Sequence, residues 1–303
     1  MPELPEVEII KQGIEPLIMG RSIVAVERRH SQPSQHPDGQ MYVDQDVLEH
    51  VVIGSHVTAV RRRAKVLMID LSSDLSLLFH LKMTGQVVLD KPGNGKQETA
   101  NSQRFGGGHP TKSLVQELPD SSTRTIIELN DGTRLYFNDQ RKFGWIKVVP
   151  TGEINNLKFF QKVGPEPLGD AHTVDNLSKK LQKRTIALKS ALLDQSTVAG
   201  TGNIYADEAL NLAKLSPLRQ ANSLSKQELI RLHAAIPHVM QASIERGGTS
   251  FSNYVNHMGL FGDYLQHARA FNRTGQPCLN CGRPISKIKV NGRGTHYCPH
   301  CQK

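Results

Sequence analysis

The chain begins with Met1-Pro2-Glu3-Leu4-Pro5-Glu6-Val7-Glu8, and the interpretation of all later segments depends on this stretch. An initiator methionine is normally removed before a residue as small as proline, so we expect the mature chain to begin at Pro2. Its α-amino group would titrate at about 7.7–8.0, far below a lysine, and would be partly unprotonated at neutral pH. A secondary amine followed by Glu3 and Glu6 has the components for Schiff-base chemistry. Taken alone, however, the stretch more simply predicts a helix with Pro5 in its first turn.

Length and charge narrow the class of protein. A chain of 303 residues suggests about two domains, and 37 Lys and Arg against 28 Asp and Glu leave a net charge of +9. This excess predicts a polyanionic partner. No apolar run approaches the roughly 20 residues that span a bilayer, and the N-terminus lacks the apolar region of a signal peptide. We therefore expect a cytoplasmic protein without membrane contact.

The first half of the sequence predicts a helix followed by an antiparallel β domain. Residues 5–19 carry apolar side chains at helical spacing, closed by Gly20. Asn130-Asp131-Gly132 predicts a tight hairpin between two strands. Many short strands separated by turn residues predict a sandwich; the expected strands cover residues 22–26, 57–60, 66–71, 75–81, 125–129, 134–137 and 145–149.

Two polar segments interrupt this pattern. Residues 30–40 are expected to form a loop. Residues 90–122 contain Arg104-Phe105-Gly106-Gly107-Gly108-His109, whose glycines could hold a phosphate, but no Lys-Ser/Thr follows in P-loop register. A mobile surface insertion is the favoured interpretation.

The second half predicts helices. Thr173 is expected to cap a helix to Gln182, and Thr185 another to Asp194; further helices cover residues 203–214 and, from a capping box at Ser225, 225–246. The fold class is thus α+β multidomain. The expected domains are a β-sandwich with an N-terminal helix (1–150), a linker (151–170), a helical domain (171–265) and a small domain that contains the four cysteines (266–303).

The cysteines give the most specific chemical signal. Cys278-x2-Cys281 and Cys298-x2-Cys301 are separated by sixteen residues, a spacing typical of four-cysteine zinc sites. Four thiolates complete a tetrahedral Zn²⁺ and leave no position for substrate, so we expect one structural zinc holding a β-hairpin. Redox-active CxxC pairs are the weaker alternative.

Two further motifs favour phosphate binding. Arg61-Arg62-Arg63-Ala64-Lys65 could contact a nucleic-acid backbone, although a solvated charge run would have the same composition. Residues 194–205 join two helices through Gly200 and Gly202, and this turn would direct backbone N–H groups and Asn203 outward from a helix N-terminus.

Six motifs together resemble the formamidopyrimidine-DNA glycosylases, which are bifunctional base-excision enzymes with a helix–two-turn–helix domain. The resemblance covers nearly the whole chain in family order and rests on the opening motif, Ala64-Lys65, His80-Leu81-Lys82-Met83-Thr84-Gly85, Asp139-Gln140-Arg141-Lys142-Phe143-Gly144, Gly200–Tyr205 and the cysteines. It implies removal of oxidised purines (8-oxoguanine and formamidopyrimidines) from double-stranded DNA, followed by β,δ-elimination, by an enzyme that is expected to be a monomer.

The resemblance also implies roles for single residues. Pro2 is the nucleophile, Glu3 the proton donor and Glu6 a supporting acid; Lys65 is assigned to β-elimination and Arg293 to δ-elimination. Met83, Arg141 and Phe143 match the side chains that fill the space left by an extruded base. Further expected DNA contacts are His80, Lys183, Lys189 and Asn203, and residues 247–262 match a loop that closes over the base.

The chain departs from the family pattern at Ser122, where a DNA-contacting His is common, at Lys142 (often Arg), at Phe271 (usually Tyr), and in the length of the 90–122 insertion. Two alternatives stay open. One is an endonuclease VIII-like enzyme for oxidised pyrimidines, which the Leu4 of the opening motif disfavours. The other is a non-catalytic, zinc-containing binder of damaged DNA, which would need no free N-terminal amine.

Overall fold

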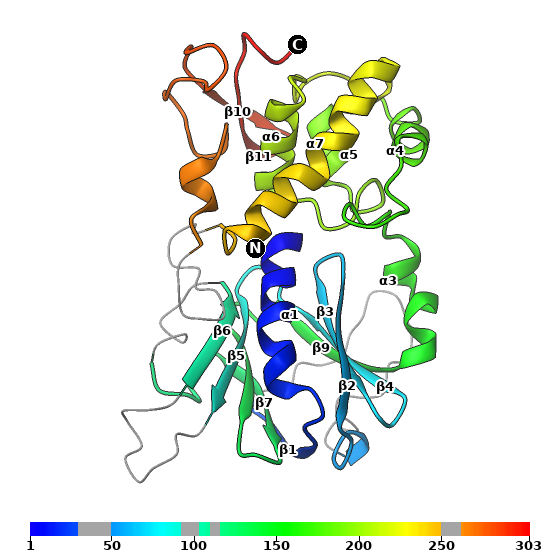
Figure 1. The fold of residues 1–303 in the computed structure, drawn as a ribbon, viewed down its shortest axis with the longest axis vertical. Coiled ribbons are helices and arrows are strands. Elements are labelled where there is room, and N and C mark those ends of the chain that lie inside the picture. The colour runs from blue at the N-terminus through cyan, green and yellow to red at the C-terminus, as the bar shows by residue number, and fades with distance from the viewer. Residues whose placement is uncertain (30–49, 92–102, 110–115, 250–261) are drawn as a thin grey trace. The chain divides into compact units, whose positions relative to one another are not determined.

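The structure is a computed structural model that describes residues 1–29, 50–91, 103–109, 116–249 and 262–303. Its contacts divide the chain into two compact units (Figure 1). The first contains Met1–Pro2 and Glu6–Gln161. The second contains Glu3–Pro5, Lys162–Thr249 and Asp263–Lys303. No helix among the described residues is long and apolar enough to cross a membrane.

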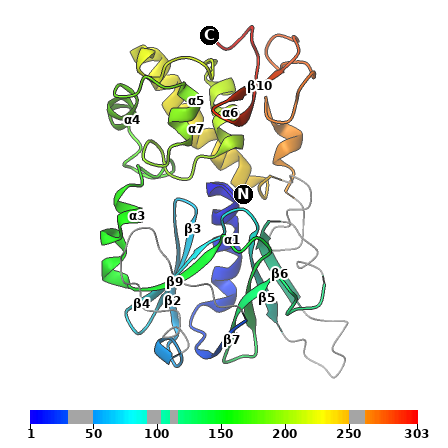
Figure 2. The same ribbon diagram turned by 180° about the vertical axis from the view of Figure 1, so that it is seen from behind.

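The first unit is an antiparallel β-sandwich with helix α1 (Leu4–Ile18) against its core. The four-stranded sheet contains, in spatial order, β2 (Val57–Arg63), β3 (Val66–Leu71), β4 (Leu75–His80) and β9 (Trp145–Pro150). The five-stranded sheet contains β1 (Ile23–Arg28), β7 (Thr123–Leu129), β8 (Arg134–Asp139), β5 (Gly85–Lys91) and β6 (Gln103–Gly108). Figures 1 and 2 show the two sheets on either side of α1.

One hydrophobic core joins these elements, because the apolar side chains of α1 recur every three or four residues and reach it from one face of the helix. Val7, Ile10 and Ile14 pack with side chains of both sheets, such as Leu67 and Phe137. The predicted sandwich is confirmed. The Asn130-Asp131-Gly132 turn also forms as expected, with Gly132 at φ 80° and a Leu129–Thr133 hydrogen bond of 2.8 Å.

The insertion at residues 90–122 differs in part from the expectation of a mobile surface segment. Residues 103–108 form β6, the edge strand next to β5. At Gly108 the backbone has φ 131° and runs so close to β5 that a Cβ would lie 2.6 Å from Gln86 Cα. Sequence reasoning missed this strand because QRFGGG has no apolar alternation, and it missed β5 as well. Residues 30–40 of the first expected loop lie outside the described residues.

The second unit consists of helices and a terminal hairpin. The helices are α4 (Val174–Leu181), α5 (Leu188–Leu193), α6 (Asn203–Leu212) and α7 (Lys226–Glu245), and the hairpin consists of β10 (Ser286–Val290) and β11 (Arg293–Tyr297). Thr173 caps α4 and the Ser225–Glu228 capping box is present. Thr185 does not cap α5, which begins only at Leu188 after an extended Ala187.

The expected linker, residues 151–170, contains a 3-10 helix (η2, Thr151–Asn156) and the short helix α3 (Lys158–Gln161). The two units divide at the end of α3. The zinc hairpin belongs to the same unit as the helices: the amide of Asn211 on α6 donates to the side chain of Gln302 at 2.9 Å, and the Gln302 amide donates to Leu215 O at 2.8 Å. The separate boundary at residue 265 stays a prediction. Residues 250–261 of the loop expected to close over the base lie outside the described residues.

Candidate active site and DNA interface

The predicted catalytic residues occur in both units, and each is described within its own. In the first unit Pro2 is buried, and Glu6 and Lys65 are 3 % and 6 % exposed. Lys65 occupies the two-residue turn between β2 and β3, where Ala64 takes φ 52°. A short hairpin turn of this kind requires a positive φ, which a non-glycine residue adopts only where its surroundings hold it there.

An ion pair fixes the Lys65 turn to helix α1. Arg62 Nε lies 2.8 Å from Glu8 Oε2, and both side chains are largely buried. Burial alone would raise the pKa of Glu8, but the hydrogen bonds and charges of Arg62 and Lys11 outweigh it and lower that pKa. Arg62 also donates to Ala64 O at 3.0 Å. The helix that carries Glu6 therefore also positions the turn that carries Lys65.

His80, an expected DNA contact, lies at the end of β4 and is only 6 % exposed. Its ring packs against Trp145 and Phe159, with centroid distances of 5.4 and 6.0 Å. Its Nδ1 accepts the N–H of Lys82 at 3.1 Å. Burial, together with the charges of Lys82 and Lys65, lowers the pKa of His80 to about 3, so the imidazole is neutral. We therefore reassign His80 to holding the turn before Met83.

The three expected void-filling side chains lie on two loops of the first unit. Met83 and Phe143 are 37 % and 52 % exposed, and Arg141 is exposed with its guanidinium carbon 4.7 Å from the Phe143 ring centroid. Buried Met and Phe side chains usually belong to a hydrophobic core, but these two are exposed and do not. Lys142, between Arg141 and Phe143, is exposed at φ 59°.

Sequence reasoning missed His109, which follows β6. Its N–H donates to Gly85 O at 2.9 Å, and its carbonyl accepts the side-chain amide of Gln86. Burial and the N-terminal ammonium lower the pKa of His109, while the Asp139 carboxylate acts in the opposite direction. The edge strand thus places an imidazole near the chain terminus. Nothing in the glycine-rich sequence around His109 indicates that it lies near the N-terminus.

In the second unit Glu3 occupies the N-terminus of α6. Its carboxylate accepts the N–H groups of Ile204 at 3.1 Å and Tyr205 at 3.4 Å. A helix N-terminus offers unpaired N–H groups and favours negative charge. At Gly202 a Cβ would lie 2.6 Å from Glu3 Oε2, so only glycine admits this carboxylate. The turn expected to bind phosphate thus holds the expected proton donor.

The same turn is held by its own side chains. Gln195 donates to Thr201 O at 2.8 Å and accepts the N–H of Gly200 at 2.9 Å. Gly200 O in turn accepts the N–H of Leu4 at 3.1 Å, and a Cβ at Gly200 would collide with the Leu4 side chain. Asn203 is half-buried at the first position of α6. These contacts fix the polypeptide directly after Pro2.

The expected DNA contact of Lys189 is not supported, because its side chain is fully buried. The ammonium lies 2.7 Å from Asp207 Oδ1 and donates to Gly294 O at 2.8 Å and Thr295 Oγ1 at 2.9 Å. Burial lowers the pKa of Lys189, while the Asp207 carboxylate opposes that shift. We reassign this side chain to holding β11. Lys183, by contrast, is exposed.

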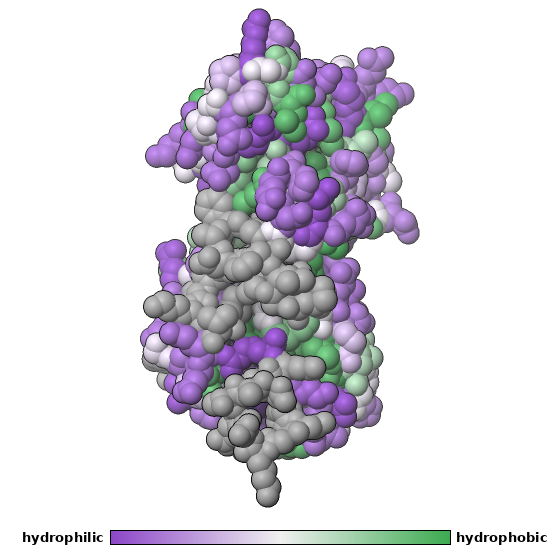
Figure 3. All heavy atoms as spheres, turned by 60° about the vertical axis from the view of Figure 1, so that its left-hand side comes forward, coloured by the Kyte–Doolittle hydropathy of each residue, from purple (hydrophilic) through white to green (hydrophobic). Residues whose placement is uncertain are grey.

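The hairpin tip that carries Arg293 is anchored from both sides. Asn291 and Gly292 form its turn with φ 45° and 77°, and the Asn291 amide donates to Ser190 Oγ at 2.7 Å. Lys189 binds the strand after the turn. Arg293 itself is exposed, and the hairpin also exposes cationic side chains at Arg283, Lys287 and Lys289, whereas His296 is buried. Hydrophilic residues dominate the described surface seen in Figure 3.

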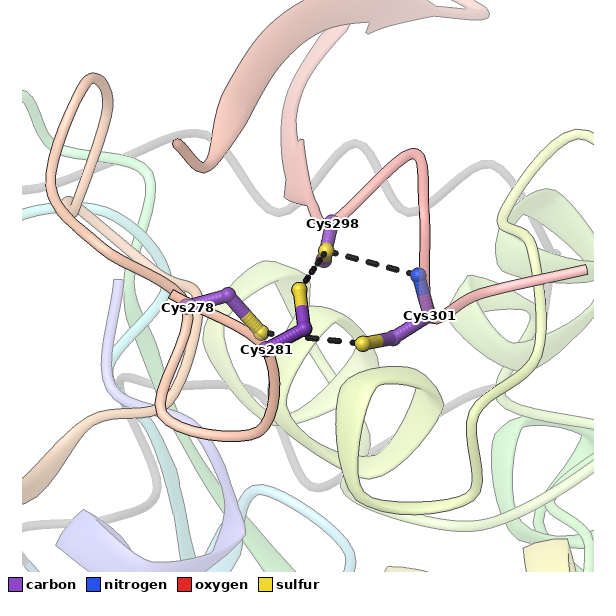
Figure 4. Close-up of side chains that lie close together, drawn as sticks. All are labelled: Cys278, Cys281, Cys298 and Cys301. Carbon is purple, nitrogen blue, oxygen red and sulfur yellow. Dashed lines mark hydrogen bonds between the residues drawn. The ribbon is translucent and has the colours of Figure 1, made fainter. Parts of the chain in front are cut away.

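The four cysteines converge on one point (Figure 4). All four Sγ atoms lie within 4.8 Å of one another, with 4.0 Å from Cys278 to Cys301 and 3.6 Å from Cys281 to Cys298. Zn–S bonds of about 2.3 Å in a tetrahedron would separate the sulfurs by about 3.8 Å. The donor set therefore fits one structural zinc, as predicted, and the thiols form no disulfide.

Two departures from the family pattern have structural roles. Ser122 is buried, and its N–H and hydroxyl both donate to Asp120 Oδ1 at 2.7 Å, so it forms the turn before β7. Phe271 packs its ring 5.0 Å from that of His296. Its N–H donates to Glu208 Oε1 at 2.7 Å, and Glu208 also accepts the N–H groups of Arg269 and Ala270.

Family models match the chain in three successive segments. Models described as the formamidopyrimidine-DNA glycosylase N-terminal domain, its H2TH domain, and the zinc finger found in FPG and IleRS match residues 1–146, 163–255 and 275–303. The formamidopyrimidine-DNA glycosylases of Herpetosiphon aurantiacus and Listeria innocua are 39 % and 38 % identical, over the full length of both chains in each pair.

Solved structures agree as well. The MutM (Fpg) protein of Thermus thermophilus shares 35 % identity at a TM-score of 0.79, covering 99 % of this chain and 98 % of that one. A Lactococcus lactis Fpg mutant in complex with Fapy-dG containing DNA shares 30 % identity at a TM-score of 0.82, covering all of both chains. Together, the fold, the sites and these matches define a zinc-containing DNA glycosylase of base excision repair. The chain belongs to the formamidopyrimidine-DNA glycosylase family, whose members combine glycosylase and AP lyase activities.

Proposed function

We propose that this protein removes 8-oxoguanine and formamidopyrimidines from double-stranded DNA with the amine of Pro2 as the nucleophile. Removal of Met1, which is exposed, would free that amine. The observation that carries the proposal is the seat of Glu3 on the α6 N-terminus, which orients an acid directly beside Pro2 in the sequence. Two backbone donors and the glycine at position 202 serve this one carboxylate.

The reaction follows from the chemistry of a secondary amine. Pro2 N attacks C1′ as the bond from C1′ to the base breaks, and the base leaves with the proton that the amine gives up. Glu3 protonates the sugar ring oxygen as the ring opens, and the nitrogen becomes a cationic iminium. This electron sink acidifies the C2′ proton, so elimination breaks the bond from C3′ to its phosphate oxygen.

Lys65 and Arg293 are assigned to the eliminations. Lys65 contacts phosphate and assists the first step. Arg293 assists the second, which breaks the C5′ bond to the other phosphate. The product is a one-nucleotide gap with phosphate at both ends. The space left by the extruded base is filled by Met83, Arg141 and Phe143. The DNA backbone is contacted by Lys183 and Asn203. The proposed enzyme acts as a monomer on chromosomal DNA in the cytoplasm.

Borohydride trapping tests the nucleophile. With an 8-oxoguanine–cytosine duplex we expect a covalent protein–DNA adduct, because borohydride reduces the iminium. The adduct should disappear in Pro2→Gly and when the N-terminus is blocked by a retained extension. A lesion panel separates the alternatives: a clear preference for thymine glycol indicates the pyrimidine-directed enzyme. The absence of any adduct on oxidised-purine duplexes would refute the proposal in favour of a non-catalytic binder.

A further inference from the structure

A buried carboxylate joins the two loops that carry the void-filling side chains. Asp139, the last residue of β8, accepts the hydroxyl of Thr84, which follows Met83 in the first loop. In the second loop it accepts the N–H of Gly144 at 2.6 Å and the N–H of Arg141 at 3.2 Å. The Arg141 N–H also lies 3.0 Å from Thr84 Oγ1, so the two loops share this donor. Asp139 is 1 % and Thr84 7 % exposed.

The backbone around this carboxylate has no free space. A Cβ at Gly144 would lie 3.0 Å from Asp139 Oδ2 and 2.8 Å from Phe137 Cζ. A Cβ at Gly85 would lie 2.7 Å from Leu81 Cα. The carboxylate and Phe137 therefore leave room only for glycine at position 144, whereas glycine at position 85 is required by the tight turn at Leu81 in its own loop. The base of the two loops is polar and buried, whereas their tips are exposed.

An ordinary turn would not need this arrangement. The bond from Arg141 N–H to the carboxylate two residues earlier is a common Asx turn. The hydroxyl of Thr84, however, belongs to a loop 55 positions away, and the Gly144 N–H lies beyond Phe143 at the far end of the second loop. The Asp139 backbone is itself held, since its N–H donates to Ser122 O and its carbonyl accepts Arg124 Nε, each at 2.8 Å.

We propose that Asp139, acting through Thr84, is a positioning residue that keeps the two loops in one arrangement, so that Met83, Arg141 and Phe143 enter the duplex as a single unit. The inference rests on the proposed function. Extruding a base is unfavourable, and filling the gap offsets that cost only when the filling groups are already in place. An abasic site has no base to extrude, so its cleavage should depend less on the arrangement.

The test compares two substrates in single turnovers of the zinc-loaded full chain with a mature N-terminus. We expect Asp139→Asn and Thr84→Val to slow excision from an 8-oxoguanine–cytosine duplex about tenfold or more, because each removes a hydrogen bond to a charged group. Cleavage of a duplex with a preformed abasic site should change less than about threefold. The fluorescence rise of 2-aminopurine next to the lesion, which reports unstacking, should slow in parallel. Thr84→Ser keeps the hydroxyl and should restore the rates.

Asp70→Asn is the matched control, since Asp70 is a buried aspartate of the other sheet that accepts Arg61 at 2.8 Å and Ser76 at 2.7 Å. It should leave the ratio of the two activities unchanged. An equal fall of both activities in Asp139→Asn, or normal excision, would overturn the positioning role. A wild-type chain that neither excises nor forms an adduct would instead point to failure of the proposed function.

Discussion

At the scale of single residues, the seat of Glu3 depends on a missing side chain. Gly202 is in extended backbone, φ −131°, so any residue could adopt its conformation. The requirement for glycine is therefore steric, since a Cβ would meet the Glu3 carboxylate at 2.6 Å. A glycine that resembled a phosphate-binding signal in the sequence is explained by the carboxylate of Glu3, the proposed proton donor of the same chain.

Gly202→Ala should lower base excision at least about a hundredfold, because displacement of a catalytic group by about 1 Å is sufficient for such a loss. Single-turnover excision with wild-type and variant protein measures this. Gly152→Ala is the control, since nothing lies within 4 Å of a Cβ there and its φ is not in the left-handed region. Comparable rates for Gly202→Ala and Gly152→Ala would contradict the steric argument.

His80 makes the stability of the folded protein depend on pH. Its folded pKa of about 3 is below the ordinary value of 6.5, so between these values the unfolded chain binds a proton that the folded chain does not. Stability is therefore unaffected above pH 6.5 and falls as the pH falls below it.

His80→Phe keeps an aromatic ring against Trp145 and removes the titration. Urea unfolding at pH 7 and pH 4 should show a loss of stability on acidification that is smaller in the variant by roughly 2–3 kcal/mol. The same acid sensitivity in both proteins would show that His80 is not protected from protons in the folded state.

At the scale of elements, the β10–β11 hairpin is held by an ion pair that is fully buried, Lys189–Asp207. Asp207 also accepts the backbone N–H of His296 at 2.8 Å. Charges are costly to bury unless every partner is present. The pair therefore fixes the position of the strand that begins with Arg293.

Lys189→Met leaves Asp207 buried without its cation and should destabilise the protein by about 3–5 kcal/mol. Under conditions in which the variant is still folded, base excision should continue, but the cleavage products should shift from δ-elimination towards β-elimination. The reason is that Arg293 loses the contact that positions its strand. Denaturant unfolding and gel analysis of the cleaved ends provide the two readouts.

Lys179→Met is the matched control, because Lys179 and Asp175 pair at 2.6 Å on the surface with about 70 % exposure. Exposed pairs of this kind contribute roughly 0.3–0.5 kcal/mol. If Lys189→Met were as stable as Lys179→Met, the buried pair would have no structural role.

At the scale of the whole molecule, we expect the N-terminal sandwich to stay folded when zinc is removed. Chelation of zinc, or Cys298→Ser, should weaken DNA binding because the small core around Cys278, Ile285 and Cys298 cannot hold Arg293 without the metal. The N-terminal unit has a core of its own.

Trp145, the single tryptophan, lies on β9 and reports on that unit. Its fluorescence unfolding transition should remain in the metal-free protein, while the dissociation constant for lesion DNA rises at least about tenfold. A control with zinc restored to the chelated wild type should recover binding. Unchanged DNA affinity without metal would contradict the role of the zinc hairpin.

The sequence by itself determined the features that depend on neighbours along the chain. The periodicity of Val7, Ile10 and Ile14 predicts α1, and the Asn130-Asp131-Gly132 turn predicts its hairpin. The cysteine spacing predicts the zinc site, since four ligands in two short loops need little else. The sequence did not predict strand β6, because this strand is held by backbone pairing with β5 and has no apolar pattern of its own.

Only the tertiary structure decided which polar groups meet across long separations. Glu3 binds N–H groups about 200 positions away, Lys189 turns inward to Asp207 and Gly294, and Asp139 reaches Thr84. The residue type of a lysine or an aspartate does not distinguish an exposed ligand-binding role from a buried structural one. Burial makes that distinction, because a charge removed from water must find its partners inside the protein.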